Sequence, residues 1–279
     1  MAAALINGRP ADCLSIADRG LQYGDGLFET IAVHAGKAIL LAQHLQRLVD
    51  GCQRLLLLPP DPADLTRRIE SLARDGNPSA VIKLIITRGA SGRGYAPAPR
   101  ARPTTILTRH AFPAYPDAWW RDGIAARWCD MRLGRNARLA GVKHLNRLEQ
   151  VLARAEWTDS TIAEGIMRDS EAHVIEGVMS NLFILKDNCL HTPKLAESGV
   201  DGVMRRQVLK MADACGYDTR VGVIHRKDVL AADALLFSNS LIGLWPVRRL
   251  ETHGFQPAAF PTKLVASARA LARGEQAAS

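Results

Sequence analysis

The sequence has little of what marks several large classes of protein. Its five cysteines are far apart and form no C-x-x-C pair, which argues against a disulfide framework. The eight histidines show no H-x-H or H-x-x-x-H spacing, so a metal site has no support. No apolar run approaches the ~18 residues of a membrane-spanning helix, and the start, MAAALINGRPADC, does not resemble a signal peptide. We therefore expect a cytoplasmic chain without a metal ion.

The composition is that of a globular protein with an excess of basic residues. Hydrophobic residues make up 47% and charged residues 23% of the 279 positions, which is enough to build a core. The net charge of +8 raises the possibility of nucleic-acid binding, but the 36 Lys and Arg are spread among 28 acids without a dense basic cluster. Solubility or a small anionic substrate fits this distribution better than nucleic acid does.

Short apolar runs with strand character alternate irregularly with helical patterns, which predicts a mixed α/β fold in two units. We expect an N-terminal α/β domain over 1–109, a linker over 110–121 and a C-terminal α/β domain over 122–279. Helices are predicted at 43–57, 61–76 and 203–216, and strands at 27–34, 80–89, 104–110, 123–129 and 234–240.

Lys143 stands just before a predicted helix in AGVKHLNRLEQVLARAEW. Leu145, Leu148 and Leu152 recur at helical spacing and predict a buried face, while Asn146 and Glu149 resemble a capping box. The positive end of a helix dipole disfavours an ammonium, so Lys143 is either a solvated surface lysine or a more easily neutral nucleophile or base.

Other candidates are ambiguous when each is considered alone. Glu176, in the apolar run HVIEGVMSNLFIL, either faces solvent by alternation or is paired in a site. Gly202 opens a helix whose N–H groups suit phosphate, but many helices begin after glycine. SNSLIG (238–243) is either a ligand-binding strand end or a turn. Arg47 fits a helix rim, and Arg93 and Tyr95 fit either a surface loop or a glycine-rich ligand loop.

These candidates together match the needs of pyridoxal phosphate. That cofactor needs a lysine for its aldehyde, a carboxylate for its ring nitrogen, and N–H groups, hydroxyls and an arginine for its phosphate. At this point the chain resembles the fold-type IV pyridoxal-phosphate enzymes, a family of aminotransferases and lyases. The matching strings run in the family's order: DRGLQYGDGLFET, HLQRL, TRGASGRGY, KHLNRLEQVLA, EGVMSNLF, TPKLAESGVDGVMR and SNSLIGLWPV.

The resemblance implies a role for each candidate. Lys143, in the C-terminal domain, would bind pyridoxal 5'-phosphate as a Schiff base, and Glu176 would pair with its pyridine nitrogen. The phosphate would be held by Arg47, by the helix start, and by the strand end; these residues are Arg47, Gly202, Val203, Met204, Asn239 and Ser240. Relatives often have threonine where this chain has Met204, so only the backbone N–H would remain there.

The family also implies an active site between the two domains, in a homodimer. KHLNRLEQVLARAE and RGASGRGYAP are most similar to the lyases that remove pyruvate from 4-amino-4-deoxychorismate in folate biosynthesis. Arg93 and Tyr95 would then contact the substrate. GDGLFE is similar to D-amino-acid aminotransferases, so a D-amino-acid or branched-chain aminotransferase is the alternative. A non-catalytic relative would be expected to lack Lys143 or Glu176.

Overall fold

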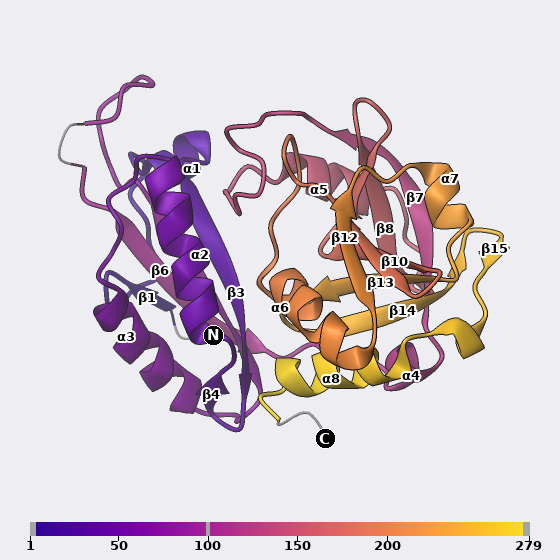
Figure 1. Ribbon diagram of the computed structural model, residues 1–279. Helices are drawn as coiled ribbons and strands as arrows, with labels where there is room; N and C mark the ends of the chain where they lie inside the picture. Colours follow the sequence, from indigo (N-terminus) through magenta and orange to yellow (C-terminus); the bar gives the residue numbers. More distant parts are fainter. Residues whose placement is uncertain (1–3, 99–100, 276–279) are drawn as a thin grey trace. The chain divides into compact units, whose positions relative to one another are not determined.

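A computed structural model describes residues 4–98 and 101–275 of the chain (Figure 1). These residues form two compact units by their contacts. The first contains the described residues up to Pro113 together with Val142–Asn146, and the second contains Ala114–Gly141 together with the described residues from Arg147 onward. The mixed α/β class expected from the sequence is confirmed.

The first unit is an antiparallel sheet covered on one face by two helices. Its strands pair in the order β2-β1-β6-β5-β3-β4. The elements are β1 (Ala4–Ile6), β2 (Arg9–Pro10), α1 (Arg19–Tyr23), β3 (Gly26–His34), β4 (Lys37–Ala38), α2 (Leu41–Arg54), α3 (Pro62–Arg74), β5 (Ala80–Thr87) and β6 (Thr104–Ala111).

The core of this unit follows from strand alternation and helix periodicity. Leu27, Ile31 and Val33 of β3 point toward the same core as the apolar faces of α2 and α3, represented by Leu48 and Ile69. Figure 1 shows both helices along one face of the sheet. Helix α3 has the N-terminus that its sequence predicts, because Asp61 accepts a hydrogen bond from Ala63 N and Pro62 follows it.

The second unit is built on a nine-stranded sheet that closes on itself. Strand order is β12-β11-β10-β13-β14-β7-β8-β9, β15 pairs with β14, and β9 also pairs with β10 at Glu176 and Asn181. The strands are β7 (Ile124–Leu133), β8 (Ile162–Asp169), β9 (Val174–Gly177), β10 (Asn181–Lys186), β11 (Cys189–Pro193), β12 (Asp218–Gly222), β13 (Ala234–Asn239), β14 (Gly243–Leu250) and β15 (His253–Gly254).

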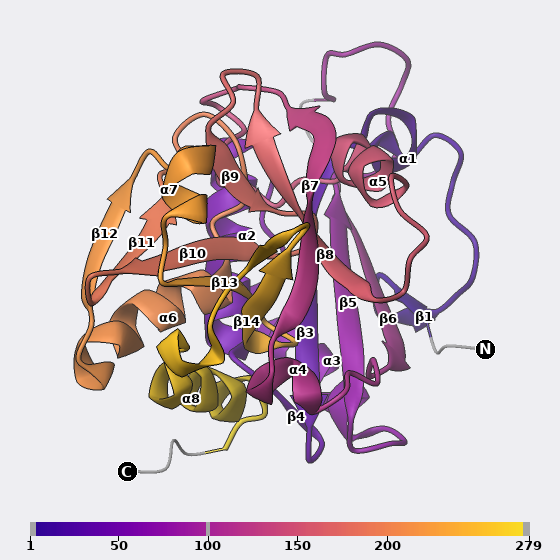
Figure 2. The same ribbon diagram turned by 90° about the vertical axis from the view of Figure 1, so that its right-hand side faces the viewer.

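Helices line the outside of this ring of strands. They are α4 (Ala118–Arg121), α5 (Leu148–Arg154), α6 (Val203–Ala212), α7 (Arg226–Leu230) and α8 (Thr262–Ala272), with short 3-10 turns at Asp213–Cys215 and Pro257–Ala259. Figure 2 shows α6 and α8 next to each other below β13 and β14. Large apolar side chains, among them Phe237 and Trp245, fill the core.

The structure differs from the predicted elements in three places. The helix predicted over 43–57 ends at Arg54, and the guanidinium of Arg88 donates hydrogen bonds to the carbonyls of Leu55 and Leu56 that follow it. The expected linker, 110–121, contains the end of β6 and all of α4. The third difference is that the segment Val142–Asn146, expected in a C-terminal domain over 122–279, packs with the first unit. The division by contacts places the boundary between Pro113 and Ala114, while the predicted domain limits remain a prediction.

Within residues 4–98 and 101–275, no helix combines the length and apolar character needed to cross a bilayer. The same residues contain no group of three or more His, Cys, Asp or Glu side chains arranged to hold a metal ion.

Candidate active site

Lys143 lies in a segment with strand-like backbone that hydrogen-bonds to the start of β3 and so adds to the sheet of the first unit. Phe28 N donates to the Lys143 carbonyl at 3.1 Å and Leu145 N donates to the Gly26 carbonyl at 3.0 Å. The Nζ atom of Lys143 lies 4.2 Å from the centroid of the Phe28 ring. Val142, which is buried, packs into the core behind it. Strand β3 therefore fixes the backbone of the lysine, and Phe28 lies against its amine.

The helix predicted to follow Lys143 is shorter than the sequence suggested, and a different face of it is buried. It begins at Leu148 with Arg147 at the N-cap, and Leu148 and Leu152 are 68% and 48% exposed. Asn146 donates instead to the Gly24 carbonyl at 3.2 Å. Glu149 accepts from Gly134 N at 2.8 Å. The predicted capping box and buried leucine face are therefore wrong. Because a dipole acts within the first turn, the dipole argument for Lys143 is wrong as well.

Arg47 belongs to a buried group of three charged side chains in the first unit. Its Nε donates to Glu29 Oε1 at 2.8 Å and its Nη2 pairs with Glu29 Oε2, while His44 Nδ1 lies 2.7 Å from the same Oε2. Burial alone would raise the pKa of Glu29, but Arg47 and His44 outweigh it and hold that pKa at about 2. Burial lowers the pKa of His44, and the charges of Arg47 and Lys143 add to this, although Glu29 opposes it.

Glu29 and His44 were missed in the sequence, yet both carried a signal. Strand alternation places Glu29 on the inward face of β3 with Leu27 and Ile31. His44 and Arg47, three residues apart, share one face of α2. A charged residue on an apolar strand face, with two basic residues on one helix turn, would have identified the group.

Glu176 is buried on β9 in the second unit, so the structure favours a paired glutamate over a solvent-facing one. Its Oε2 accepts from Val200 N at 2.8 Å. Asn181, its partner in the strand register, donates from Nδ2 to the Val200 carbonyl at 2.7 Å. Burial lowers the pKa of Arg147 and the charge of Glu176 opposes this shift, so the two groups lie within electrostatic reach. A carboxylate held in this way suits a protonated ring nitrogen.

Helix α6 begins where the sequence predicted. Gly202 is its N-cap and makes no side-chain capping bond, and Val203 and Met204 are buried in the first turn. A Cβ on Gly202 would come within 2.0 Å of Asn181 Oδ1, so only glycine fits without a shift. The start of this ten-residue helix therefore presents backbone N–H groups next to the Glu176–Asn181 pair.

The strand end at 238–243 contains both expected residues and one that was missed. The Asn239 side chain accepts from Leu241 N and Ile242 N at 2.9 and 3.0 Å and donates to the Met179 carbonyl at 3.2 Å. Ser240 lies half-buried in the same turn. Ser238 is buried, and its hydroxyl has no hydrogen-bond partner among the described residues. Its position inside the strand run ALLFSNS gave no separate signal.

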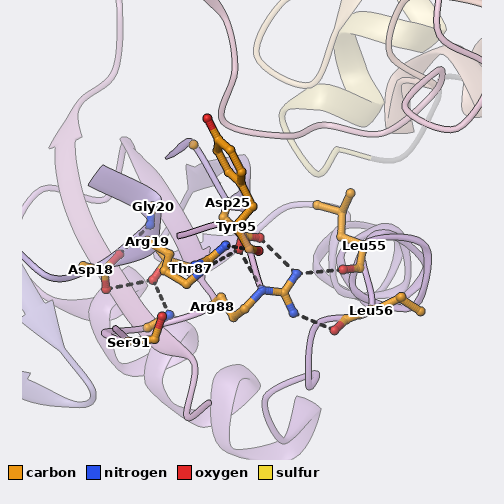
Figure 3. Close-up of polar contacts among 12 residues, drawn as sticks. Asp18, Arg19, Gly20, Asp25, Leu55, Leu56, Thr87, Arg88, Ser91 and Tyr95 are labelled. Atoms are coloured by element: carbon orange, nitrogen blue, oxygen red, sulfur yellow. Dashed lines mark hydrogen bonds and ion pairs between the residues drawn. The ribbon is translucent and has the colours of Figure 1, made fainter. Parts of the chain in front are cut away.

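Arg93 and Tyr95 lie in an exposed loop of the first unit, and the Tyr95 side chain is 86% exposed. Arg19 holds this loop from within the unit (Figure 3). Its guanidinium donates to the carbonyls of Gly94 and Tyr95 at 2.8 and 3.0 Å and pairs with Asp25 at 2.9 Å. Sequence reasoning missed this role of Arg19.

Asp25 connects the loop to the end of α2. Arg88 donates to both Asp25 oxygens, at 2.7 and 3.0 Å, and to the carbonyls of Leu55 and Leu56 (Figure 3). Burial would raise the pKa of Asp25, but Arg88 and Arg19 outweigh it and lower that pKa. Two guanidinium groups share one carboxylate, and this charged, hydrogen-bonded group anchors the loop.

Glu164 is a second buried carboxylate in the unit of Glu176. It accepts from Ser180 Oγ at 2.6 Å, Gly165 N at 2.9 Å and Val178 N at 3.0 Å. Burial raises the pKa of Glu164 to about 7 despite these donors. Glu164 thus holds the turn between Glu176 on β9 and Asn181 on β10.

The donor set of each unit fits pyridoxal phosphate. The second unit offers a buried carboxylate for a ring nitrogen, and a glycine-capped helix start and a partnerless buried hydroxyl for a phosphate. The first unit offers a lysine with a fixed backbone and a buried arginine.

Known proteins are similar to this chain over most of its length. The family model of class IV aminotransferases matches residues 26–250. An aminodeoxychorismate lyase of Vibrio harveyi is 40% identical over 87% of this chain and 89% of its own length. A putative branched-chain-amino-acid aminotransferase of Methanocaldococcus jannaschii is 31% identical, over 88% of this chain and 87% of its own.

Solved structures extend the likeness to three dimensions. The crystal structure of 4-amino-4-deoxychorismate lyase from Pseudomonas aeruginosa matches with a TM-score of 0.89 and 45% identity, over 94% of this chain and 96% of that one. The PLP-bound form of a hypothetical aminotransferase from Mycobacterium tuberculosis matches with a TM-score of 0.82 and 24% identity, over 95% and 98% of the two chains. At that identity the second match concerns the fold alone.

Proposed function

Because this chain belongs to the class IV aminotransferase family, we propose that it is a pyridoxal-phosphate-dependent lyase that removes pyruvate from 4-amino-4-deoxychorismate and leaves 4-aminobenzoate. One observation carries the choice of reaction: two lyases named for this substrate are 40% and 45% identical over most of both chains. The 31% identity to a branched-chain aminotransferase supports the aminotransferase as the second candidate.

Besides Lys143, the residues assigned to the cofactor are Arg47, Glu176, Gly202, Val203, Met204, Ser238, Asn239 and Ser240. Glu176 would keep the ring nitrogen protonated, since its carboxylate is buried and already fixed by Val200 N. Arg47, oriented by Glu29, would supply positive charge to the phosphate, and the N–H groups of Val203 and Met204 after Gly202 would add neutral donors. Ser240 and the buried Ser238 would donate their hydroxyls, while Asn239, whose side chain is used within its turn, would contribute by shaping that turn.

Lys143 would bind the cofactor as a Schiff base and then move the proton. When bound, pyridoxal phosphate would supply an electron sink for the carbon that carries the substrate amine. The Nζ of Lys143, once released, would take the proton from that carbon. The C–O bond between the ring and the enolpyruvyl group would then break, and the released enolpyruvate would take up a proton to become pyruvate. Formation of the aromatic ring would drive the step. Arg93 would pair with a substrate carboxylate through its fork of N–H groups, and Tyr95 would orient the ring.

We also propose that the protein acts as a cytoplasmic homodimer. The exposed side chains of Leu148, Val151 and Leu152 on α5 support an association surface, because they form an apolar stripe on one short helix. Light scattering of the purified protein should give twice the 30.4 kDa of one chain. A monomer at the concentration of the assay would contradict this.

The deciding experiment is to mix the purified, cofactor-loaded protein with 4-amino-4-deoxychorismate. Fluorescent 4-aminobenzoate and pyruvate should appear in equal amounts. A yellow protein that gives neither product but transfers amino groups between amino acids and keto acids would establish the second candidate.

Lys143→Ala tests the central residue assignment. The variant should lose both turnover and the visible absorbance of the bound cofactor. Lys37→Ala is the matched control, because Lys37 is an exposed lysine of the same unit. Normal absorbance and turnover in Lys143→Ala would remove Lys143 from the proposal.

A further inference from the structure

Three arginines of the second unit gather outside the residues assigned to the cofactor and substrate. Arg132 on β7 and Arg168 on β8 stand directly opposite each other in a parallel strand pair. Arg226 is the first residue of α7. We refer to Arg132, Arg168 and Arg226 as the arginine cluster.

Two members of the arginine cluster lie against one tryptophan. The guanidinium carbons of Arg168 and Arg226 are 5.3 and 5.1 Å from the ring centroid of Trp128, which is buried. A guanidinium resting on an aromatic ring uses its face there, so its N–H edge stays available for oxygen atoms. Trp128 therefore acts as a fixed support for two sets of donors.

The positive charge of the arginine cluster exceeds the negative charge around it. Like charges directly opposite on paired strands are destabilising. Glu251 lies 3.9 Å from Arg226 and also accepts from Trp128 N at 3.3 Å. Burial lowers the pKa of Arg168, the charges of Arg132 and Arg226 lower it further, and Asp130 opposes them. Two partly exposed acids thus face three arginines.

Two N–H groups of the arginine cluster are buried without a partner. They are Arg168 Nε and Arg132 Nη1, and neither meets an acceptor among the described residues. The Nη2 of Arg168 makes one long bond, to the Cys129 carbonyl at 3.4 Å. Buried donors are satisfied in native proteins, by water or an ion where protein groups are missing. The unpartnered donors and the excess charge both call for an oxyanion.

We propose that the arginine cluster is a binding site for a phosphate group, either inorganic phosphate or a phosphomonoester, distinct from the residues assigned to the cofactor's phosphate. The donors come from two strands and a helix, and several N–H groups on separate elements suit a tetrahedral anion with several acceptor oxygens better than a planar carboxylate. The ligand would offset the repulsion between Arg132 and Arg168 and give the two buried N–H groups an acceptor.

The test is a phosphorus NMR titration of the cofactor-loaded protein with inorganic phosphate at constant ionic strength. The bound cofactor has its own phosphorus resonance, so binding at the cofactor's phosphate can be seen separately. Saturable broadening of the free phosphate signal should appear while the cofactor resonance stays unchanged. Acetate at the same ionic strength should not reverse the broadening.

Variants connect the binding to the arginine cluster. Arg168→Gln and Arg226→Gln should each weaken phosphate binding by about tenfold or more, as expected for loss of a charged hydrogen bond. Arg121→Gln is the matched control, because Arg121 is an exposed arginine of the same unit that pairs with Asp122; it should bind phosphate like the wild type. If Arg168→Gln does not fold, Arg226→Gln decides, because its side chain is half exposed.

Four results would overturn the proposal. The first is a free phosphate signal without saturable broadening, and the second is equal phosphate affinity in Arg226→Gln and wild type. The third is a cofactor resonance that moves together with the broadening, and the fourth is acetate that displaces phosphate as readily as added phosphate does. Inorganic phosphate that binds with release of a phosphomonoester from the protein as purified would support the site and identify the phosphomonoester as its occupant.

Discussion

Glu29 shows how much of the first unit depends on single charged residues. Its carboxylate is 1% exposed and pairs with both Arg47 and His44. Taking away one member of a buried ion pair leaves the other charge without compensation, which costs far more than the pair itself contributes. We therefore regard Glu29 as the residue that holds Arg47 in place for its proposed contact with the phosphate.

Glu29→Gln should destabilise the first unit by about 3 kcal/mol at neutral pH. The pKa of Glu29 is about 2 in the folded protein and 4.5 in the reference state, so its ionised form stabilises the fold above pH 4.5. That contribution is lost as the pH falls through 4.5 toward 2. Urea unfolding at pH 7 and pH 3 should show the variant's deficit shrinking at pH 3.

The exposed Glu70 of the same unit provides the control for this measurement. Glu70→Gln should change the unfolding midpoint little at either pH. A deficit for Glu29→Gln that is equally large at pH 3 would mean that packing, and not the charge, is what Glu29 supplies.

Glu164 should have the opposite pH dependence. Its pKa is raised from 4.5 to about 7, so the folded state holds the proton more tightly than the unfolded state does. The contribution of Glu164 to stability should be largest below pH 4.5 and fall by at most about 3 kcal/mol as the pH rises through 7. Glu164→Gln should remove this fall in urea unfolding, whereas Glu197→Gln, a change at an exposed carboxylate of the same unit, should keep it. A wild-type slope in Glu164→Gln would show that another group titrates.

At the scale of single residues, the sequence indicated candidate positions better than it indicated their contacts. Glu176 and Gly202 were identified because an acid in an apolar strand and a glycine before a helix are local signals. Arg19, Glu29 and Glu164 act through partners up to 76 residues away along the chain, as Arg19 does with Tyr95. Such partners are set by the fold and have no local signature.

At the scale of elements, the loop over 89–98 and the end of α2 are both held, through one arginine each, by the carboxylate of Asp25. Arg19 and Arg88 both bind Asp25, and each also bonds to backbone carbonyls, Arg19 in the loop and Arg88 after the helix. Loops that contact ligands need such a rigid base if their side chains are to be placed reproducibly.

Arg19→Gln should loosen the loop without disturbing the cofactor. The KM for 4-amino-4-deoxychorismate should rise on the order of tenfold with kcat nearly unchanged, because only substrate contacts are affected. The visible absorbance of the cofactor should stay as in wild type. Arg67→Gln, at an exposed arginine of α3, is the control. A fall in kcat at unchanged KM would place Arg19 in the chemistry instead.

Helix α5 shows why element boundaries could not all be predicted. Its leucines have helical spacing, yet only Ala153 is buried within it. Periodicity reports which residues share a face, whereas burial depends on what packs against that face. The leucines are exposed in the single chain, so the pattern predicted burial for a helix face that the chain itself does not cover.

At the scale of the whole molecule, the resemblance of ordered motifs predicted the family and the fold class, and both are confirmed. The path of the chain was not predicted: it leaves the first unit after Pro113 and re-enters it for Val142–Asn146. Composition and periodicity are local quantities, so they assigned this segment to the domain that surrounds it in sequence.

Val142→Ala should separate the two units in an unfolding experiment. The lost methyl groups should destabilise the first unit by about 1–2 kcal/mol. All five tryptophans (Trp119, Trp120, Trp128, Trp157 and Trp245) belong to the second unit, whereas Lys143 belongs to the first. Cofactor absorbance should therefore be lost at lower urea while the tryptophan fluorescence midpoint stays in place. Equal shifts of both signals would mean that the units unfold as one.

The pairing of Lys143 with β3 has a consequence for synthesis on the ribosome. Residues up to Pro113 leave the ribosome before the segment Val142–Asn146, which follows 33 residues later (146 minus 113). At ~5–20 residues per second, the start of β3 keeps unpaired backbone N–H and C=O groups at this edge for roughly two to seven seconds. During that interval this edge is open to pairing with other chains, and the segment that carries Lys143 is what closes it.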